Sequence, residues 1–214
     1  MTPCRLHITC ASGTGTTTLG RAVATTWSVP HADTDDYFWA PTSPPYTTKR
    51  DGTDRLRLMH EMFVGREAWV LSGTLMGWGD SLAEHFDAVV FLSLDHDERM
   101  DRLRAREVTR YGVSIETGGS RATAHHEFMQ WAGGYEDPDF DGRNRARRQA
   151  WLGTLPCTVL RLDSARPVDE LVKEIIEFSP PERTLRADMC TVETCPQKRP
   201  TCRGTSACGD TALR

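Results

Sequence analysis

Short apolar runs alternate with longer amphipathic segments along most of the chain. The runs predict β-strands at residues 6–9, 29–33, 68–72, 88–92 and 158–162. Two of them, 68–72 and 88–92, are almost continuously apolar. Such runs are typical of strands that are covered on both faces of a parallel sheet.

Apolar residues at helical spacing fill the stretches between and after these strands. They predict helices at residues 17–27, 54–66, 97–110, 125–131, 143–151 and 168–178. Strands that alternate with helices form βαβ units, which give a parallel α/β sheet with right-handed crossovers. The chain has 214 residues, 38% of them hydrophobic, which is enough for one well-buried domain and leaves little for a second.

The composition changes near the C-terminus. Residues 179–214 hold four Pro and four Cys but no aromatic residue. A segment of this kind has too little apolar surface to offset the entropy of ordering it. We therefore expect one domain at residues 1–178 and a disordered Pro/Cys-rich tail at 179–214, with a metal-bound or disulfide-linked appendage as the alternative.

The net charge and the hydropathy of the chain limit the kinds of partner that it can bind. The net charge of −4 argues against broad binding to nucleic acid. No apolar run approaches the roughly 20 residues that span a bilayer, and the N-terminus lacks a signal-peptide pattern. We expect a cytoplasmic protein, monomeric or weakly dimeric, with reduced thiols and a small molecule as its partner.

A loop rich in Gly and Thr joins the first predicted strand to the first helix. Gly13 and Gly15 allow the backbone to curl closely around an anion, and the amides at a helix N-terminus favour phosphate. Thr17 falls where a hydroxyl binds Mg²⁺. This context favours a phosphate-binding loop over an ordinary strand–turn–helix junction. The residues expected to bind the phosphates of ATP are Ala11, Ser12, Gly13, Thr14, Gly15, Thr16, Thr17 and Thr18.

The loop departs from the pattern G-x-x-x-x-G-K-[ST] at two positions. Cys10 occupies the first Gly position, and Thr16 occupies the Lys position. The lysine normally supplies a positive charge to the β- and γ-phosphates. Its loss keeps two alternatives open, a catalytically silent nucleotide-binding module and a slow NTPase that acts as a switch.

The segment at residues 8–19 resembles the P-loop of adenylate kinase-like and shikimate kinase-like small-molecule kinases. A Gly-x-Gly-Thr-Thr-Thr version with Thr in place of Lys is familiar from archaeal-type cytidylate kinases, so the missing lysine is compatible with catalysis. The resemblance covers about residues 5–178 by element order. It implies a three-layer P-loop NTPase fold with strand order 2-3-1-4-5 and a helical lid at about 107–147. It also implies Mg²⁺-dependent phosphoryl transfer from ATP to a nucleoside monophosphate or a small hydroxyl metabolite.

An acidic cluster follows the second predicted strand. Asp33, Asp35 and Asp36 should face the phosphate loop, since ligands of open α/β sheets collect beyond the carboxyl ends of the strands. The segment resembles the Asp-x-Asp motif of shikimate kinase-like enzymes. This implies that Asp33 is the catalytic carboxylate on the metal side and Asp35 the one on the acceptor side, with Asp36 also near the substrate. The alternative is a helix N-cap, but three carboxylates within four residues exceed what a cap requires.

Two further positions are candidates for the acceptor side. Arg50 ends a Pro/Thr-rich loop and has the charge to hold an anionic group, although a solvated position is equally compatible with the sequence. Gly73 follows the third predicted strand, where the kinases bring backbone close to the acceptor. We expect both residues to bind the substrate.

A strongly charged helix is predicted at residues 97–110. Arg102 and Arg106 are four residues apart and share one face of it. The resemblance implies that Arg102 stacks on the adenine and that Arg106 is catalytic, reaching the transferring phosphate. Arg166, after the last predicted strand, resembles a residue that contacts the edge of the adenine.

Without the loop lysine, arginines must supply more of the charge that phosphoryl transfer requires. The leading candidate is Arg106. The next candidates, which are also expected to bind the substrate, are Arg110, Arg143 and Arg145. Arg99 and Arg104, in contrast, are expected on the solvated face of their helix, paired with nearby acids.

Overall fold

The computed structural model describes residues 1–179. The expectation of a disordered Pro/Cys-rich tail concerns residues that lie, apart from Ser179, outside this range. None of the helices at residues 1–179 is long and apolar enough to cross a membrane.

A five-stranded, all-parallel sheet forms the centre of the described part. Its order is β2-β3-β1-β4-β5, as predicted. The strands are β1 (Arg5–Thr9), β2 (His31–Asp33), β3 (Trp69–Ser72), β4 (Ala88–Ser93) and β5 (Thr158–Asp163). All residues of β3 and all but the last residue of β4 are buried, so the apolar runs of these two strands do mark strands that are covered on both faces.

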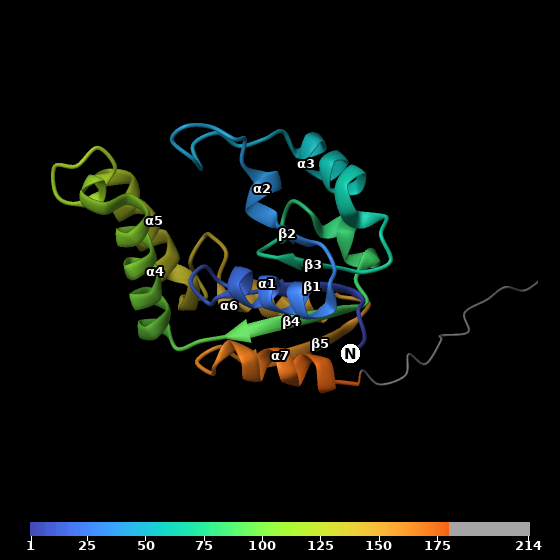
Figure 1. Cartoon of the computed structure of the whole chain (residues 1–214). Coiled ribbons are helices and arrows are strands. Elements are labelled where there is room, and N and C mark those ends of the chain that lie inside the picture. The colour runs from blue at the N-terminus through green and yellow to red at the C-terminus, as the bar shows by residue number, and fades with distance from the viewer. Residues whose placement is uncertain (180–214) are drawn as a thin grey trace, which may run out of the picture. The chain divides into compact units, whose positions relative to one another are not determined.

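Helices cover both faces of the sheet and extend beyond its edge (Figure 1). They are α1 (Thr16–Trp27), α2 (Thr34–Phe38), α3 (Gly52–Met59), α4 (His96–Tyr111), α5 (Ala122–Gly133), α6 (Arg145–Gly153) and α7 (Val168–Glu177), and a π-helical turn at His60–Val64 continues α3. On one face, α1 packs against α7. On the other face, His7 of β1 stacks on Phe86 and meets the edge of Trp151 of α6.

The helices α4 and α5 pack side by side and stand away from the carboxyl end of β4 (Figure 1). The lid was expected at about residues 107–147, a range that contains α5 and the C-terminal end of α4. Asp95 caps α4 by accepting hydrogen bonds from the amides of Asp97 and Glu98. The α/β architecture, with helices around a parallel sheet, agrees with the prediction.

Two local features differ from the sequence prediction. The short helix α2 was not predicted, because five residues are too few to show a helical period; the Asp33 side chain caps it by accepting from the amide of Asp35. Helix α6 begins at Arg145, two residues later than expected, because the Asn144 side chain caps it by accepting from the amide of Arg147.

The junction between β3 and α2 requires a glycine. Gly73 has φ +108°, and a Cβ at this position would lie 1.9 Å from Oγ1 of Thr34. That hydroxyl accepts a hydrogen bond from the amide of Thr74, 3.1 Å away. The backbone after β3 thus lies directly against the first residue of α2 and holds the acidic segment in place.

We predict that Gly73→Ala lowers the free energy of unfolding by at least about 2 kcal/mol, because strain at positive φ adds to an overlap with Thr34. Denaturant unfolding measures this change. Gly153→Ala is the matched control, since a Cβ at Gly153 meets nothing within 4 Å. Equal stability of the two variants would contradict the tight junction.

Candidate functional site

The loop between β1 and α1 packs against the base of α4. Gly13 has φ +93° and Gly15 has φ +85°, both in the left-handed region that favours glycine. A Cβ at Gly13 would lie 2.7 Å from Cγ of Leu103 and 2.8 Å from the carbonyl oxygen of Arg99. The Thr14 hydroxyl donates to the carbonyl of Ala11 at 2.9 Å and braces the turn. Both glycines are therefore needed for the shape of the loop.

The Asp33 carboxylate lies beside the first turn of α1. Its Oδ2 accepts hydrogen bonds from Thr17 Oγ1 at 2.6 Å and from Ser72 Oγ at 3.0 Å. Its Oδ1 accepts from the amide of Asp35 at 3.0 Å. Asp33 is thus a helix N-cap, the alternative role that the sequence left open for the acidic cluster. It also contacts Thr17, the residue expected to bind Mg²⁺ together with it.

The donor chemistry of this pair fits Mg²⁺. Hydroxyl and carboxylate oxygens are hard ligands, and Mg²⁺ is usually held by one or two carboxylates together with substrate phosphates and water. In the described part of the chain, no three His, Cys, Asp or Glu side chains form a metal-binding group. Thr17 and Asp33 are therefore the residues that would hold the ion, together with a nucleotide.

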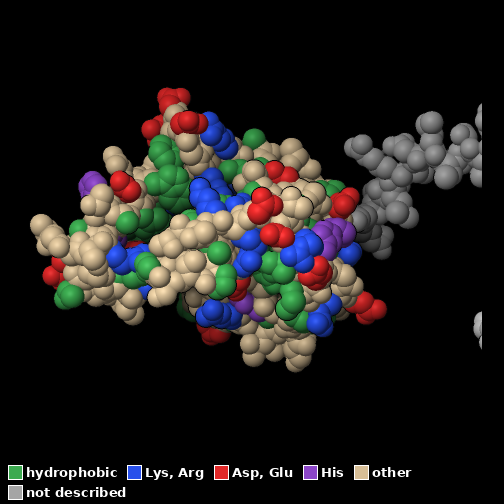
Figure 2. All heavy atoms as spheres, turned by 90° about the horizontal axis from the view of Figure 1, so that it is seen from above, with side chains coloured by type: hydrophobic (Ala, Val, Ile, Leu, Met, Phe, Trp, Pro, Cys, Tyr) green, Lys and Arg blue, Asp and Glu red, His purple; other side chains and the backbone are tan. Residues whose placement is uncertain are grey.

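A cleft with a volume of about 440 Å³ lies over the loop. This is within the range of small-molecule sites, about 300–1,000 Å³. Its lining includes the predicted residues Ala11, Ser12, Gly13, Thr14, Gly15, Thr16, Thr17, Thr18, Asp33, Asp35, Gly73, Arg102, Arg106, Arg143 and Arg166. Seen from above, the molecule shows basic side chains beside acidic ones near the middle of its surface (Figure 2). One cleft thus brings together most of the side chains singled out in the sequence.

Asp35 lies on the wall of this cleft. Desolvation, followed by repulsion from the Asp33 carboxylate, raises the pKa of Asp35 to about 6. The charges of Arg106 and Arg143 act in the opposite direction and favour the carboxylate. The pKa of Asp35 is thus closer to neutral pH than that of an ordinary Asp, as suits a residue that accepts a proton.

The arginines of the cleft differ in how they are held. Arg102 donates to the carbonyl of Ser164 at 3.0 Å and pairs with Glu98. Arg106 pairs with the buried Glu107 at 3.1 Å. Arg143 is half-buried, and among the described residues no carboxylate oxygen lies within 4.0 Å of its guanidinium. Arg143 therefore offers the cleft a charge without an ion-pair partner in this range.

Four predicted residues do not line the cleft: Asp36, Arg50, Arg110 and Arg145. Arg50 donates to the carbonyls of Tyr37 and Trp39 and braces its own loop. Arg110 lies over the ring of Tyr46, 5.0 Å from its centroid. Arg145 is exposed and pairs with Glu136 at 2.6 Å. The structure gives these arginines local partners instead of bringing them to the loop.

The expectation for Arg99 was wrong. Its side chain is not solvated; the residue is 1% exposed and donates to the carbonyls of Ser12, at 3.2 Å, and Ala132, at 2.9 Å. Arg104 does lie on the exposed face, paired with Asp101. The spacing of residues along a helix would have placed Arg99 with Met100 and Leu103 on the buried face. The many charged residues around it instead favoured the prediction that its side chain is exposed to solvent.

Sequence reasoning also missed Arg55 and Arg148. Arg55 lies over Phe38, 3.9 Å from the ring centroid, and over Trp78 at 5.6 Å. Its charge lowers the pKa of Arg143, after the larger effects of burial and of Arg148. Arg148 is 1% exposed and donates to the Thr9 hydroxyl at 2.9 Å. Both positions depend on contacts between distant segments, which a single sequence does not show.

The sheet order and the glycine-containing loop between β1 and α1 define an α/β protein with a five-stranded parallel sheet and a cleft over this loop. No model of a protein family matches the chain. The chain is 38% identical over 173 residues to the uncharacterized protein YqaC of Bacillus subtilis (strain 168), a match that covers 81% of this chain and 96% of YqaC. The protein belongs to the family of YqaC.

Solved structures with a similar arrangement include small-molecule kinases. A shikimate kinase from Bacteroides thetaiotaomicron has a TM-score of 0.47 at 18% identity, covering 81% of this chain and 96% of that one. A gluconokinase from Sinorhizobium meliloti 1021 has a TM-score of 0.45 at 20% identity, covering 80% and 89%. At these values neither protein indicates a substrate for this chain.

We predict that Asp35→Asn raises the melting temperature at pH 7.5. Because Asp35 is exposed, solvent screens part of its charge, so we expect a rise of at most about 2–4 °C, which corresponds to about 1 kcal/mol in a domain of this size. The folded state raises the pKa of Asp35, so it binds a proton more tightly than the unfolded chain does. Stability should therefore fall as pH rises from about 4 to about 6, and the variant escapes this loss.

Thermal melts from pH 4 to pH 8 check this expectation. Below about pH 4 both states of the wild type carry a protonated Asp35, so the advantage of the variant should disappear. Asp36→Asn, on the same helix but outside the cleft, should show a change of the same sign, because burial and the charge of Asp33 also raise the pKa of Asp36. An advantage of Asp35→Asn that is constant with pH would show that Asp35 does not titrate as described.

Proposed function

We propose that the protein transfers the terminal phosphate of ATP, in the presence of Mg²⁺, to a hydroxyl group of a small acceptor. One observation carries the proposal. A single cleft contains the phosphate loop, the hydrogen-bonded pair Thr17 and Asp33, and a second carboxylate, Asp35. A protein that only binds a nucleotide has no need of the second carboxylate.

The residues of the cleft have different roles, which depend on their position in it. The backbone amides of the loop and the N-terminus of α1 bind the phosphates. Thr17 and Asp33 would hold Mg²⁺, which when bound neutralises charge on the phosphates. Asp35 accepts the proton of the acceptor hydroxyl; with a pKa of about 6 it is largely deprotonated at pH 7 and poised for this transfer. Arg102 and Arg166, which also line the cleft, flank the base of the nucleotide.

Two arginines in the cleft supply positive charge near Asp35. The charges of Arg106 and Arg143 both favour its ionised form, so their guanidinium groups lie within electrostatic range of the carboxylate. Phosphoryl transfer depends mainly on positioning and on neutralising charge that spreads over the transferred group. In the transition state, these two residues supply the positive charge that a lysine in the phosphate loop would otherwise supply.

The acceptor carries an anionic group as well as a hydroxyl. Arg55 is close enough to Arg143 for the two charges to disfavour each other, and in residues 1–179 neither forms an ion pair within 4.0 Å. Two adjacent cations gain stability when a carboxylate or phosphate lies between them. Small hydroxy acids and nucleoside monophosphates both meet this requirement.

The test combines binding with turnover. ATP with Mg²⁺ should raise the melting temperature of the full-length protein, since a ligand that binds only the folded state stabilises it. A screen of hydroxy acids, nucleosides and nucleoside monophosphates should then find acceptor-dependent release of ADP. Asp35→Asn should abolish this release and retain ATP binding. Binding without release for any acceptor would favour the silent module, and no binding at millimolar ATP would reject the proposal.

Variants in which one arginine is replaced by alanine show which arginine supplies the positive charge that the phosphate loop lacks. We predict that Arg106→Ala and Arg143→Ala each lower kcat by a factor on the order of 10³, as the loss of an arginine finger does. Arg110→Ala and Arg145→Ala should be nearly silent, because their side chains lie outside the cleft. Steady-state kinetics with the best acceptor measure all four. A large loss in Arg145→Ala with none in Arg143→Ala would reverse the assignment.

A further inference from the structure

Two buried arginines lie beneath the phosphate loop. Arg99 comes from α4 and Arg148 from α6, and each is 1% exposed. Removing a guanidinium group from water costs several kcal/mol unless a counter-charge is close. Buried arginines are for this reason rare outside ion pairs.

No carboxylate compensates either charge at close range in the part of the chain that the structure describes: none of its carboxylate oxygens lies within 4.0 Å of either guanidinium. Exposed arginines of the same helices do have acidic partners, Arg104 with Asp101 and Arg147 with Asp141. Glu136 favours the charge of Arg99 from a distance, but its carboxylate is bound to Arg145.

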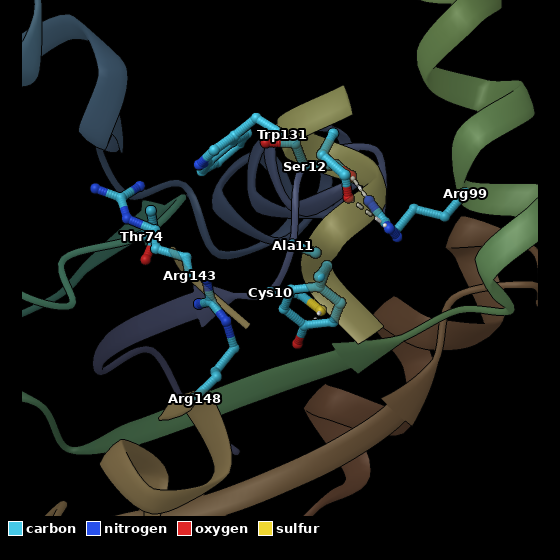
Figure 3. A pocket seen from close by; sticks show the side chains of 10 residues that line it. Cys10, Ala11, Ser12, Thr74, Arg99, Trp131, Arg143 and Arg148 are labelled. Atoms are coloured by element: carbon cyan, nitrogen blue, oxygen red, sulfur yellow. Dashed lines mark hydrogen bonds between the residues drawn. The ribbon is translucent and has the colours of Figure 1, made fainter. Parts of the chain in front are cut away.

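Neutral groups hold the two side chains in place. The centroid of the Tyr135 ring lies 5.3 Å from the guanidinium of Arg99 and 6.0 Å from that of Arg148. Arg99 donates one Nη to the carbonyl of Ser12 and the other to that of Ala132 (Figure 3). Arg148 donates to the hydroxyl of Thr9, the residue just before the loop. The Nε atoms of both arginines are buried and have no hydrogen-bond partner among the described residues. The hydrogen bonds thus fix the charges without neutralising them.

The space between the two side chains is too small for a polyatomic anion. A pocket of about 20 Å³ is lined by Cys10, Ala11, Ser12 and both arginines (Figure 3). This volume is sufficient for about one water molecule. The small pocket and the large cleft share part of their lining, namely Cys10, Ala11, Ser12, Thr74 and Arg143, so a phosphate bound in the cleft lies next to the pair.

We infer that Arg99 and Arg148 act as a buried cationic base of the phosphate loop and attract the polyphosphate of the nucleotide from behind the loop. The inference rests on the proposed function, because it requires phosphates in the cleft. Charges act more strongly through the protein interior than through water. The pair thus replaces, for binding, the charge that Thr16 does not provide at the lysine position, and an anionic ligand relieves the cost of the two buried charges.

Neutral variants of similar length test the pair. Arg99→Met and Arg148→Met are compared with Arg104→Met and Arg147→Met, which remove exposed charges from the same helices. Affinity is measured by calorimetry for ATP with Mg²⁺ and for inorganic tripolyphosphate, and the melting temperature is measured without ligand. We expect the two buried variants to bind both ligands at least ten-fold more weakly while melting at or above the wild-type temperature. The controls should bind as the wild type does.

A merely structural role gives a different result. In that case the buried variants melt at a lower temperature and the folded protein binds with unchanged affinity, which would overturn the inference. If the Met variants do not fold, Arg148→Lys decides the matter, because it keeps the charge and loses the guanidinium geometry. Affinity within three-fold of wild type then supports the electrostatic role, and a ten-fold loss refutes it.

The experiment also separates this inference from the proposed function. A wild-type protein that binds neither ATP nor tripolyphosphate would reject the proposed function itself. A wild-type protein that binds both, with Met variants of equal affinity, would reject only the role of the buried pair.

Discussion

The carboxylate of Asp33 is the interaction on which the arrangement of the cleft depends. It accepts hydrogen bonds from Thr17 in α1, Ser72 in β3 and the amide of Asp35 in α2. Through these contacts a single side chain fixes the phosphate loop relative to the acidic segment. The hydrogen bond from Ser72 is in turn supported by His31, whose Nε2 lies 3.0 Å from the serine hydroxyl. The donor and acceptor sides of the cleft therefore share one anchor.

This shared anchor has an electrostatic cost. The Asp33 charge is one of the reasons why Asp35 holds its proton more tightly than an ordinary carboxyl group. Two carboxylates so close to each other are unfavourable in an empty cleft, and they become favourable when cations lie among them. Arg106 and Arg143 provide part of this compensation. The cleft thus concentrates opposing charges that a substrate and its metal ion would balance.

The sheet could be predicted almost completely from the sequence, because its strands are short apolar runs separated by helical periods. The loop and the meeting of Thr17 with Asp33 followed from their places after β1 and β2. The arginines could not be assigned in the same way. Helical spacing puts Arg99 on the buried face of its helix, but only tertiary packing bonds it to the phosphate loop and leaves Arg102 and Arg106 in the cleft. Arg55 and Arg148 required contacts between segments far apart in the sequence.

The close approach of Gly13 to α4 limits how the helical arm can move. The glycine lies against the turn of Arg99 and Leu103, and the Ser12 carbonyl is bonded to the same helix. The first two turns of α4 are therefore fixed to the loop, and through the loop to the sheet. Any movement of the arm relative to the sheet must therefore bend the chain beyond Leu103, so the base of the arm is a fixed pivot for that movement.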